Sequence, residues 1–341
     1  MADFDLFAAA RNGSLSGAPK SALTAARLSE RNASGSTPFH GAAKYGALLD
    51  IPADLLTADH LSIKNDAGYT PLHHAAMGGH LDQIPAGLLS PQLLKLRSNA
   101  GYTVLHVAAA NGHLGQIPSG LITVEECRLP TDLGNSLLHE AAEAGTLDRL
   151  PPEFLSAANL SLRNLSGETV LHVAAFNGHL DQVPAAMMGE TALREKTSAG
   201  DTVFHAAAIS GHLDQIPAAL LTAENLSAAS KSGFTAIHAA AETGQLSSIP
   251  SDQLTASLLT TRNDNGDTPL HAAAHEGHLD QVPPTILTRE RLGIRNYEGV
   301  SVMAIAVNRG HDGQLPTSVR PKTYGALHRL FRRISRTRTP F

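Results

Sequence analysis

The chain has 341 residues, of which 42% are hydrophobic and 4% aromatic, and its formal net charge is −5 at pH 7. A single cysteine excludes a disulfide framework, and no apolar run reaches the roughly 18 residues that a membrane-spanning helix needs. The N-terminal residues contain no basic segment followed by an apolar run, so we expect a cytoplasmic protein without a secretory signal peptide.

A period of 33 residues runs through the chain. Ten column glycines from Gly13 to Gly310, nine turn glycines from Gly35 to Gly299 and ten prolines all recur at this spacing without insertion or deletion. The prolines are Pro19, Pro52, Pro85, Pro118, Pro151, Pro184, Pro217, Pro250, Pro283 and Pro316. A fixed period in this range is typical of a solenoid, in which each repeat contacts only its neighbours. Such a stack presents a long, shallow surface, which favours binding over catalysis.

In chain order, the pattern predicts four segments: an N-terminal capping repeat over residues 2–34, eight regular repeats over 35–298, a partial C-terminal capping repeat over 299–317 and a basic tail over 318–341. The first and last repeats depart from the pattern, since Phe7 and Ala304 stand where the regular repeats carry histidine. Terminal repeats of solenoids are generally atypical because one of their faces meets solvent.

The first half of each repeat predicts one short helix with a clear start and end. Near residue 266, Thr268 suits the N-cap, Pro269 suits the first helical position, and Gly277 suits a left-handed C-cap. Between them Leu270, Ala273 and Ala274 share one face of the helix. Two small residues on that face let consecutive helices approach closely, so we expect this face to form the core.

The motif G-x-T-P-L-H-x-A-A-x-x-G-H-L, present over residues 68–81 and 266–279, resembles the ankyrin repeat, whose period is also 33. The resemblance extends over about residues 32–298 and is weak in the first and last repeats. It implies an all-α solenoid of about ten 33-residue units, each with a turn and two antiparallel helices. It also implies a module that binds proteins.

The second half of each repeat departs from the ankyrin pattern. Where that family usually has an uninterrupted amphipathic helix, this chain carries a proline, as at Pro217, followed by a leucine pair and Thr222. A proline inside a helix costs about 3 kcal/mol and drives the preceding residue toward extended geometry. We therefore predict two short pieces, one that begins at the proline and one that begins at the threonine.

The 18 histidines raise a metal-site hypothesis. Most of them fall into two columns of the repeat, where neighbours lie about 8–10 Å apart, too far to share one zinc ion. Hydrogen bonds to the same or the next turn explain these columns more simply. His271 and His275 stand at i and i+4 on one helix, a spacing that can serve zinc, but no third ligand is evident. Metal binding through this pair is kept as an alternative.

No sequence pattern indicates catalysis. The glycines follow the repeat instead of clustering in a phosphate-binding loop, and no Cys-x-x-Cys pair or Ser-His-Asp arrangement is evident. Cys127 lies next to Glu125 and Glu126, whose negative charges disfavour a reactive thiolate. We expect no enzymatic activity and no cofactor.

Positions that vary between repeats are expected to carry the function. In ankyrin repeats, the residue after the turn glycine and the end of the first helix project onto the concave face, where partners commonly bind. In this chain these positions hold Tyr45, Tyr69, Met77, Tyr102, Phe176, Ile209 and Phe234. Gathered apolar side chains can form a binding hot spot, whereas singly exposed ones are common, and both interpretations stay open. Six acidic residues lie around these positions and favour a basic rim on the partner: Glu140, Glu143, Glu168, Asp201, Glu242 and Asp267.

The tail holds six arginines and one lysine without an acidic residue. Its apolar residues keep helical spacing from Tyr324 to Ile334, and Arg329, Arg332, Arg333 and Arg336 fall largely on other faces, which predicts a basic amphipathic helix. Such a helix suits a cap on the last repeat, an anionic membrane surface or a groove on a partner. The tail also looks like the export signals of some type IV secretion substrates. Nucleic acid is not expected as a partner, because the acidic body opposes it.

These observations predict a monomeric, non-catalytic scaffold that binds a protein partner through one face of an ankyrin-like solenoid. Delivery into a host cell as a bacterial effector is one setting for such a protein. The alternatives are a peripheral membrane protein that acts through the tail and a metal-binding protein that uses His271 and His275.

Overall fold

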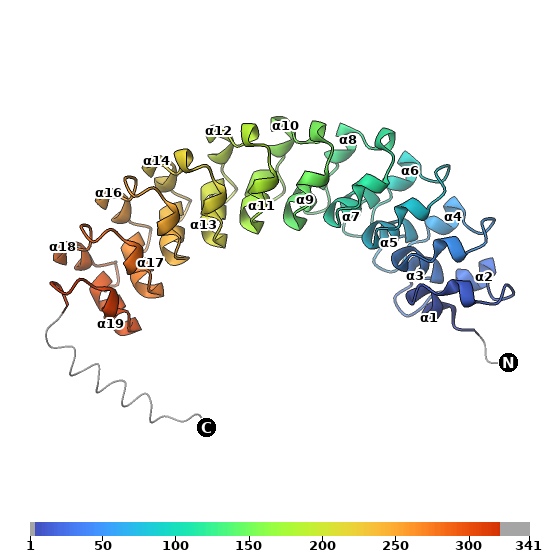
Figure 1. Cartoon of the computed structure of the whole chain (residues 1–341), viewed down its shortest axis with the longest axis horizontal. Helices are drawn as coiled ribbons and strands as arrows, with labels where there is room; N and C mark the ends of the chain where they lie inside the picture. The colour runs from blue at the N-terminus through green and yellow to red at the C-terminus, as the bar shows by residue number, and fades with distance from the viewer. Residues whose placement is uncertain (1–3, 321–341) are drawn as a thin grey trace, which may run out of the picture. The chain divides into compact units, whose positions relative to one another are not determined.

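The computed structural model describes residues 4–320, and its contacts divide the chain into two compact units. Unit 1 ends at Gln215 and unit 2 begins at Ile216. Within each unit, longer and shorter helices alternate along the chain and stack repeat upon repeat (Figure 1). Residues 4–320 contain isolated β-bridges but no β-strand. The predicted all-α repeat fold is confirmed.

Unit 1 contains seven longer and six shorter α-helices among its described residues. The longer ones are α1 (Leu6–Arg11), α3 (Pro38–Tyr45), α5 (Pro71–Gly78), α7 (Val104–Ala110), α9 (Leu137–Ala144), α11 (Val170–Asn177) and α13 (Val203–Ser210). The shorter ones are α2 (Ala25–Leu28), α4 (Ala58–Leu61), α6 (Pro91–Leu94), α8 (Val124–Cys127), α10 (Ala157–Leu160) and α12 (Glu190–Leu193). Ten 3-10 turns lie between them: η1 (Leu15–Gly17), η2 (Leu48–Asp50), η3 (Leu81–Gln83), η4 (Leu114–Gln116), η5 (Ser119–Leu121), η6 (Leu147–Arg149), η7 (Pro152–Phe154), η8 (Leu180–Gln182), η9 (Ala185–Met187) and η10 (Leu213–Gln215).

Unit 2 repeats the same alternation over its described residues. Its longer helices are α15 (Ala236–Glu242), α17 (Pro269–Glu276) and α19 (Val302–Arg309), and its shorter ones are α14 (Ala223–Ser227), α16 (Ala256–Leu259) and α18 (Arg289–Leu292). The 3-10 turns are η11 (Ala218–Leu220), η12 (Leu246–Ser248), η13 (Leu279–Gln281) and η14 (Asp312–Gln314). The similarity of the two units follows from the unbroken repeat in the sequence.

The ends of the longer helices form as the sequence predicts. At α5, the side chain of Thr70 accepts a hydrogen bond from the His73 amide, and Pro71 occupies the first helical position, where no amide donor is needed. Gly79 ends the helix with φ of 75°, a left-handed conformation in which a Cβ atom would be strained. All nineteen glycines of the two glycine columns have positive φ, and no other residue type does so within residues 4–320.

The core runs along each stack between consecutive longer helices. In α5, Leu72, Ala75 and Ala76 are fully buried, and the equivalent Leu270, Ala273 and Ala274 of α17 are also fully buried. The longer helices pack directly on one another within a unit, as α3 does on α5 and α11 on α13. The predicted Leu-Ala-Ala face is therefore the packing face, and its small alanines allow the close approach.

The second half of each repeat forms short pieces instead of one helix. Ile84, directly before Pro85, is extended with φ of −79° and ψ of 126°, as the residue before a proline is expected to be. In unit 2, Pro217 precedes η11, and Thr222 caps α14 by accepting a hydrogen bond from the Asn225 amide at 3.2 Å. The two predicted pieces are confirmed. A 3-10 turn that precedes the proline, such as η3, is an additional element that the sequence analysis did not predict.

Glutamine side chains join consecutive repeats. The Gln116 side chain accepts a hydrogen bond from the Leu81 amide at 3.0 Å and donates one to the Gly79 carbonyl at 2.6 Å, although both partners lie one repeat earlier. Gln182 makes the same pair of bonds with Leu147 and Gly145. These bonds satisfy backbone groups at the end of the preceding longer helix, where the helix itself leaves them without partners.

Candidate functional site

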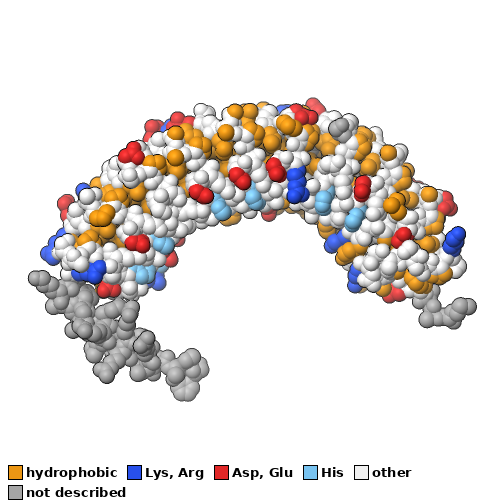
Figure 2. Space-filling view, viewed as in Figure 1, with side chains coloured by type: hydrophobic (Ala, Val, Ile, Leu, Met, Phe, Trp, Pro, Cys, Tyr) orange, Lys and Arg blue, Asp and Glu red, His pale blue; other side chains and the backbone are white. Residues whose placement is uncertain are grey.

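The turns that contain the turn glycines, from Gly35 to Gly299, are here called the hairpin tips. The candidate site is the face of each unit formed by the longer helices and the hairpin tips that precede them, here called the long-helix surface. Histidine and acidic side chains appear in rows along the side of the longer helices, and hydrophobic side chains gather over the turns and shorter helices (Figure 2). The long-helix surface is therefore polar overall, and apolar side chains on it stand out against that background.

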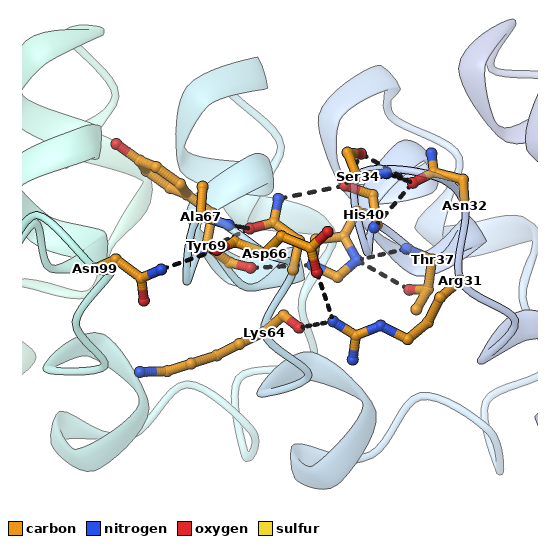
Figure 3. A network of polar contacts seen from close by, with 12 residues as sticks. Arg31, Asn32, Ser34, Thr37, His40, Lys64, Asp66, Ala67, Tyr69 and Asn99 are labelled. Atoms are coloured by element: carbon orange, nitrogen blue, oxygen red, sulfur yellow. Dashed lines mark hydrogen bonds and ion pairs between the residues drawn. The ribbon is translucent and has the colours of Figure 1, made fainter.

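A polar network fixes most of the hairpin tips to the repeat before them. Nδ1 of His40 accepts a hydrogen bond from the Thr37 amide at 3.0 Å, and Nε2 donates to the Tyr69 carbonyl at 3.1 Å (Figure 3). The Arg31 guanidinium adds a bond to the Lys64 carbonyl at 2.8 Å. One histidine thus closes the start of its own helix and holds the tip of the next repeat.

The same imidazole arrangement recurs along both units. In unit 1, His73, His139 and His172 donate to the carbonyls of the next tip, at Tyr102, Glu168 and Asp201. In unit 2, His238 and His271 do so to Asp267 and Val300. Burial lowers the pKa of the imidazole at His40, His139, His172 and His271 and lowers the pKa of His73 and His106 to about 4. These six histidines are therefore neutral at pH 7 and structural, as the hydrogen-bonding interpretation predicts.

The predicted aromatic residues of the tips lie against this column. Tyr69 meets His73 at a ring-centroid distance of 5.4 Å, and Tyr102 meets His106 at 6.3 Å. In unit 2, Phe234 packs on the ring of His238 at 5.3 Å. Tyr69, Tyr102 and Phe234 are half-buried as a result, so only part of each side chain is available to a partner.

The predicted residues at the ends of the longer helices differ in exposure. Met77 is half-buried, whereas Tyr45, Phe176 and Ile209 are exposed to 45%, 54% and 45%. Phe176 of α11 and Ile209 of α13 occupy equivalent positions on two helices that pack side by side in unit 1. The structure therefore places these two apolar side chains on neighbouring helices of one surface.

Four further exposed apolar residues were missed by sequence reasoning. Leu133 and Leu165 lie at consecutive tips of unit 1 with 63% and 75% exposure, and the Leu165 amide donates to the Leu133 carbonyl at 3.0 Å. Leu49 is 74% exposed on η2, and Tyr297 is 72% exposed at a tip of unit 2. The sequence does contain a sign of their exposure, because each stands in a repeat column that elsewhere carries mostly polar or small residues.

One of the six acidic residues expected to surround the partner-binding positions, Glu140, is buried instead. Glu140 of α9 is 5% exposed and accepts a hydrogen bond from the Asn135 side chain at 3.0 Å, and its burial raises the pKa of its carboxyl. The pKa of Tyr102 is also raised, mainly by its own burial and secondly by the negative charge of Glu140. Glu143, one turn further along α9, is exposed, whereas Glu168 and Asp201 are half-buried. Glu140 is therefore part of the interior of the repeat instead of a partner-facing charge.

The histidine pair proposed for metal binding does not form a metal site in this arrangement. Nδ1 of His271 accepts from the Thr268 amide at 3.1 Å, and Nε2 donates to the Val300 carbonyl at 3.3 Å, so both ring nitrogens are engaged. His275 instead pairs with Glu276 at 2.5 Å and contacts Arg309. Among residues 4–320, no group of three or more His, Cys, Asp or Glu side chains is arranged to hold a metal ion.

Cys127 is fully buried in α8, and burial raises the pKa of its thiol to about 12, with Glu126 adding to the effect. This thiol is not poised as a nucleophile. The tail arginines Arg329, Arg332, Arg333 and Arg336 lie outside the described residues. Within residues 4–320, no helix combines the length and apolar character needed to cross a bilayer.

Comparison with known families agrees with this geometry. A model of three ankyrin repeats matches residues 39–118 and 171–250, and a model of a single ankyrin repeat matches residues 265–283. Together the matches cover more than half of the chain. A search of curated proteins found no match. Ankyrin repeats generally act as protein-binding modules, and the chain belongs to the ankyrin repeat family.

Proposed function

We propose that this protein is a non-catalytic scaffold that binds a protein partner through the long-helix surface of unit 1. The observation that carries the proposal is the pair Phe176 and Ile209, which stand exposed on the adjacent helices α11 and α13. Large apolar side chains on a polar background are the usual anchors of a protein interface. Tyr45 and the half-buried Met77 occupy related positions further toward the N-terminus of the same unit.

The repeat position that Phe176 and Ile209 occupy also indicates the chemistry of the partner. Glu143 of α9 precedes Phe176 by one repeat, so an exposed carboxylate and two apolar side chains follow one another on three successive helices. A matching partner would present two apolar side chains next to a basic one. The apolar contacts would supply most of the affinity, and the charge would set the orientation.

The surface is also preorganised for binding. The imidazoles of His139 and His172 tie consecutive tips to the preceding helices, at 3.1 and 3.2 Å from the carbonyl oxygens of the next repeat. A partner therefore need not order these tips when it binds, which lowers the entropic cost of association. Delivery into a host cell and membrane association were inferred from the tail alone and stay hypotheses about that segment.

Affinity capture with the full-length chain tests this function. The wild type is compared with a Phe176→Ser, Ile209→Ser double variant and with Leu49→Ser, which removes an exposed apolar side chain from η2, away from the long-helix surface. We expect a partner that the wild type and Leu49→Ser retain and that the double variant loses at least about tenfold. Equal recovery by the double variant, with circular dichroism showing all three folded, would move the binding site elsewhere.

A further inference from the structure

Unit 2 contains a pocket of about 390 Å³ on its long-helix surface. It is lined by residues of α15, α17 and α19 and of the tips that precede them. Its apolar lining includes Phe234 and Ile305, and four carboxylates belong to its wall: Glu242, Asp267, Glu276 and Glu298. Among the described residues that line it, there is no lysine or arginine.

The basic groups near this pocket are already engaged. Arg309 contacts the His275 ring, and Nη1 of Arg262 donates to the carbonyls of Gly266 and Arg295 at 2.7 and 2.9 Å. The hydrogen bond from His275 lowers the pKa of the Glu276 carboxyl, so this group is negative at neutral pH. His271 is held neutral by burial, which lowers the pKa of its ring. The pocket therefore presents four carboxylates around an apolar lining, and one of them, Glu276, is paired with His275.

A side chain that fits this pocket has an apolar stem and a positively charged end. Arginine meets both requirements, because its methylene groups pack on apolar surface while its guanidinium bonds to carboxylates at the rim. Charge-assisted bonds of this kind are stronger than neutral ones, and several carboxylates around one opening can engage more than one arginine. The chemistry thus selects an arginine-rich segment.

We propose that the C-terminal segment of this chain, residues 321–341, docks into this pocket. The segment carries five arginines and one lysine and no acidic residue, which complements the four carboxylates. It continues directly from the last described residues of the same unit, and its 21 residues can reach up to about 70 Å when extended. Attachment to the same chain gives an effective concentration in roughly the millimolar range, so modest affinity suffices.

The proposal rests on the pocket of unit 2 and not on the partner surface of unit 1, so the two proposals can fail separately.

A fluorescent peptide with the sequence of residues 321–341 tests this inference on full-length proteins. One protein is the wild type, and the other carries Arg329→Gln, Arg332→Gln, Arg333→Gln and Arg336→Gln, which weakens its own segment. We expect the arginine-depleted protein to bind the peptide at least about tenfold more tightly than the wild type, because the wild-type pocket is already occupied. Equal affinity for the two proteins, or no binding to the arginine-depleted one, would overturn the proposal.

A matched pair of further variants locates the peptide. In the arginine-depleted protein, Glu242→Gln, Glu276→Gln and Glu298→Gln remove three pocket carboxylates. In the control, Asp252→Asn, Asp280→Asn and Glu290→Gln remove three exposed carboxylates that do not line the pocket and lie in turns or in α18. We expect the first set to lose peptide binding and the second to keep it. Equal loss in both sets would mean that the acidic body attracts the peptide without a defined pocket, which contradicts the proposal.

Discussion

Nε2 of His73 lies 3.1 Å from the carbonyl oxygen of Tyr102, and the opposite ring nitrogen accepts a hydrogen bond from the Thr70 amide at 3.1 Å. One imidazole thus caps a helix and fixes the tip of the following repeat. A glutamine or glutamate at this helix position can form only the capping half of the arrangement. A histidine at this position therefore links the structure of its own repeat to that of the next one.

Substitutions of His73 separate these two roles. His73→Gln keeps a side chain that can accept from the Thr70 amide but loses the bond to Tyr102, so we expect a loss of about 1–2 kcal/mol in the free energy of unfolding. His73→Ala removes both bonds and leaves a buried void, and we expect about 3 kcal/mol. Urea denaturation measures both values. Equal losses for the two variants would show that the bond to the next repeat adds no stability.

Acidification should destabilise the fold through the buried histidines. Burial lowers the pKa of His73, His74 and His106 to about 4, whereas an unfolded histidine has a pKa near 6.5. The unfolded state therefore binds more protons between these values, and stability present above pH 6.5 is lost as the pH falls toward 4. The loss approaches about 3 kcal/mol for each such histidine. A melting temperature that stays constant from pH 7.5 to pH 5 would contradict this account.

Gly79 and Gly87 form a matched pair for backbone strain. Gly79 has φ of 75°, and a Cβ atom there would lie 2.8 Å from the His113 ring of the next repeat, whereas a Cβ at Gly87 meets nothing within 4 Å. We expect Gly79→Ala to cost about 2 kcal/mol or more and Gly87→Ala to be neutral or slightly stabilising. Thermal unfolding of the two variants checks this difference. Similar melting temperatures would mean that the C-cap conformation is not strained by a side chain.

The Gln116 side chain should contribute through both of its ends. Gln116→Ala leaves the Leu81 amide and the Gly79 carbonyl without these partners, and we expect a loss of about 2 kcal/mol. Gln116→Glu keeps an acceptor for the Leu81 amide but turns a carboxylate toward the Gly79 carbonyl. It should therefore be less stable than the wild type at pH 7, and this difference from the wild type should shrink near pH 4, where the carboxylate is protonated. A Gln116→Glu variant with unchanged stability at pH 7 would contradict the assigned orientation of the amide.

Cys127 should resist modification in the folded protein. The thiol is fully buried and its pKa is raised to about 12, so very little thiolate forms at pH 8. We expect reaction with a thiol-specific reagent to follow unfolding and to become rapid only in denaturant. Stoichiometric labelling within minutes under native conditions would show that α8 opens easily.

The sequence predicted the features that depend on neighbouring residues in the chain. Thr70 and Pro71 start α5, Gly79 ends it, and Pro85 breaks the second half of the repeat, because each acts on backbone groups within a few residues. The bonds of Gln116 were not predicted, because its partners are 35 and 37 residues away and become neighbours only in the stack.

The candidate site was predicted in part for the same reason. The repeat position of Phe176 and Ile209 predicted that both side chains project from the longer helices, and both are exposed. The half-burial of Tyr69 and the burial of Glu140 depend on the column histidine and on Asn135, whose placement requires the folded tip. Leu133 was missed although its repeat column, which elsewhere carries mostly polar or small residues, indicates an exposed position.

The central claim is that a protein partner contacts the long-helix surface of unit 1, and site-specific photocrosslinking tests it most directly. A photoreactive amino acid is placed at Phe176, at Ile209 or at Leu49 in the full-length protein, which is then irradiated with the captured partner. We predict crosslinks from positions 176 and 209 and none from position 49, which lies on η2. Crosslinks from position 49 alone would place the partner on the 3-10 turns, away from the long-helix surface, and contradict the claim.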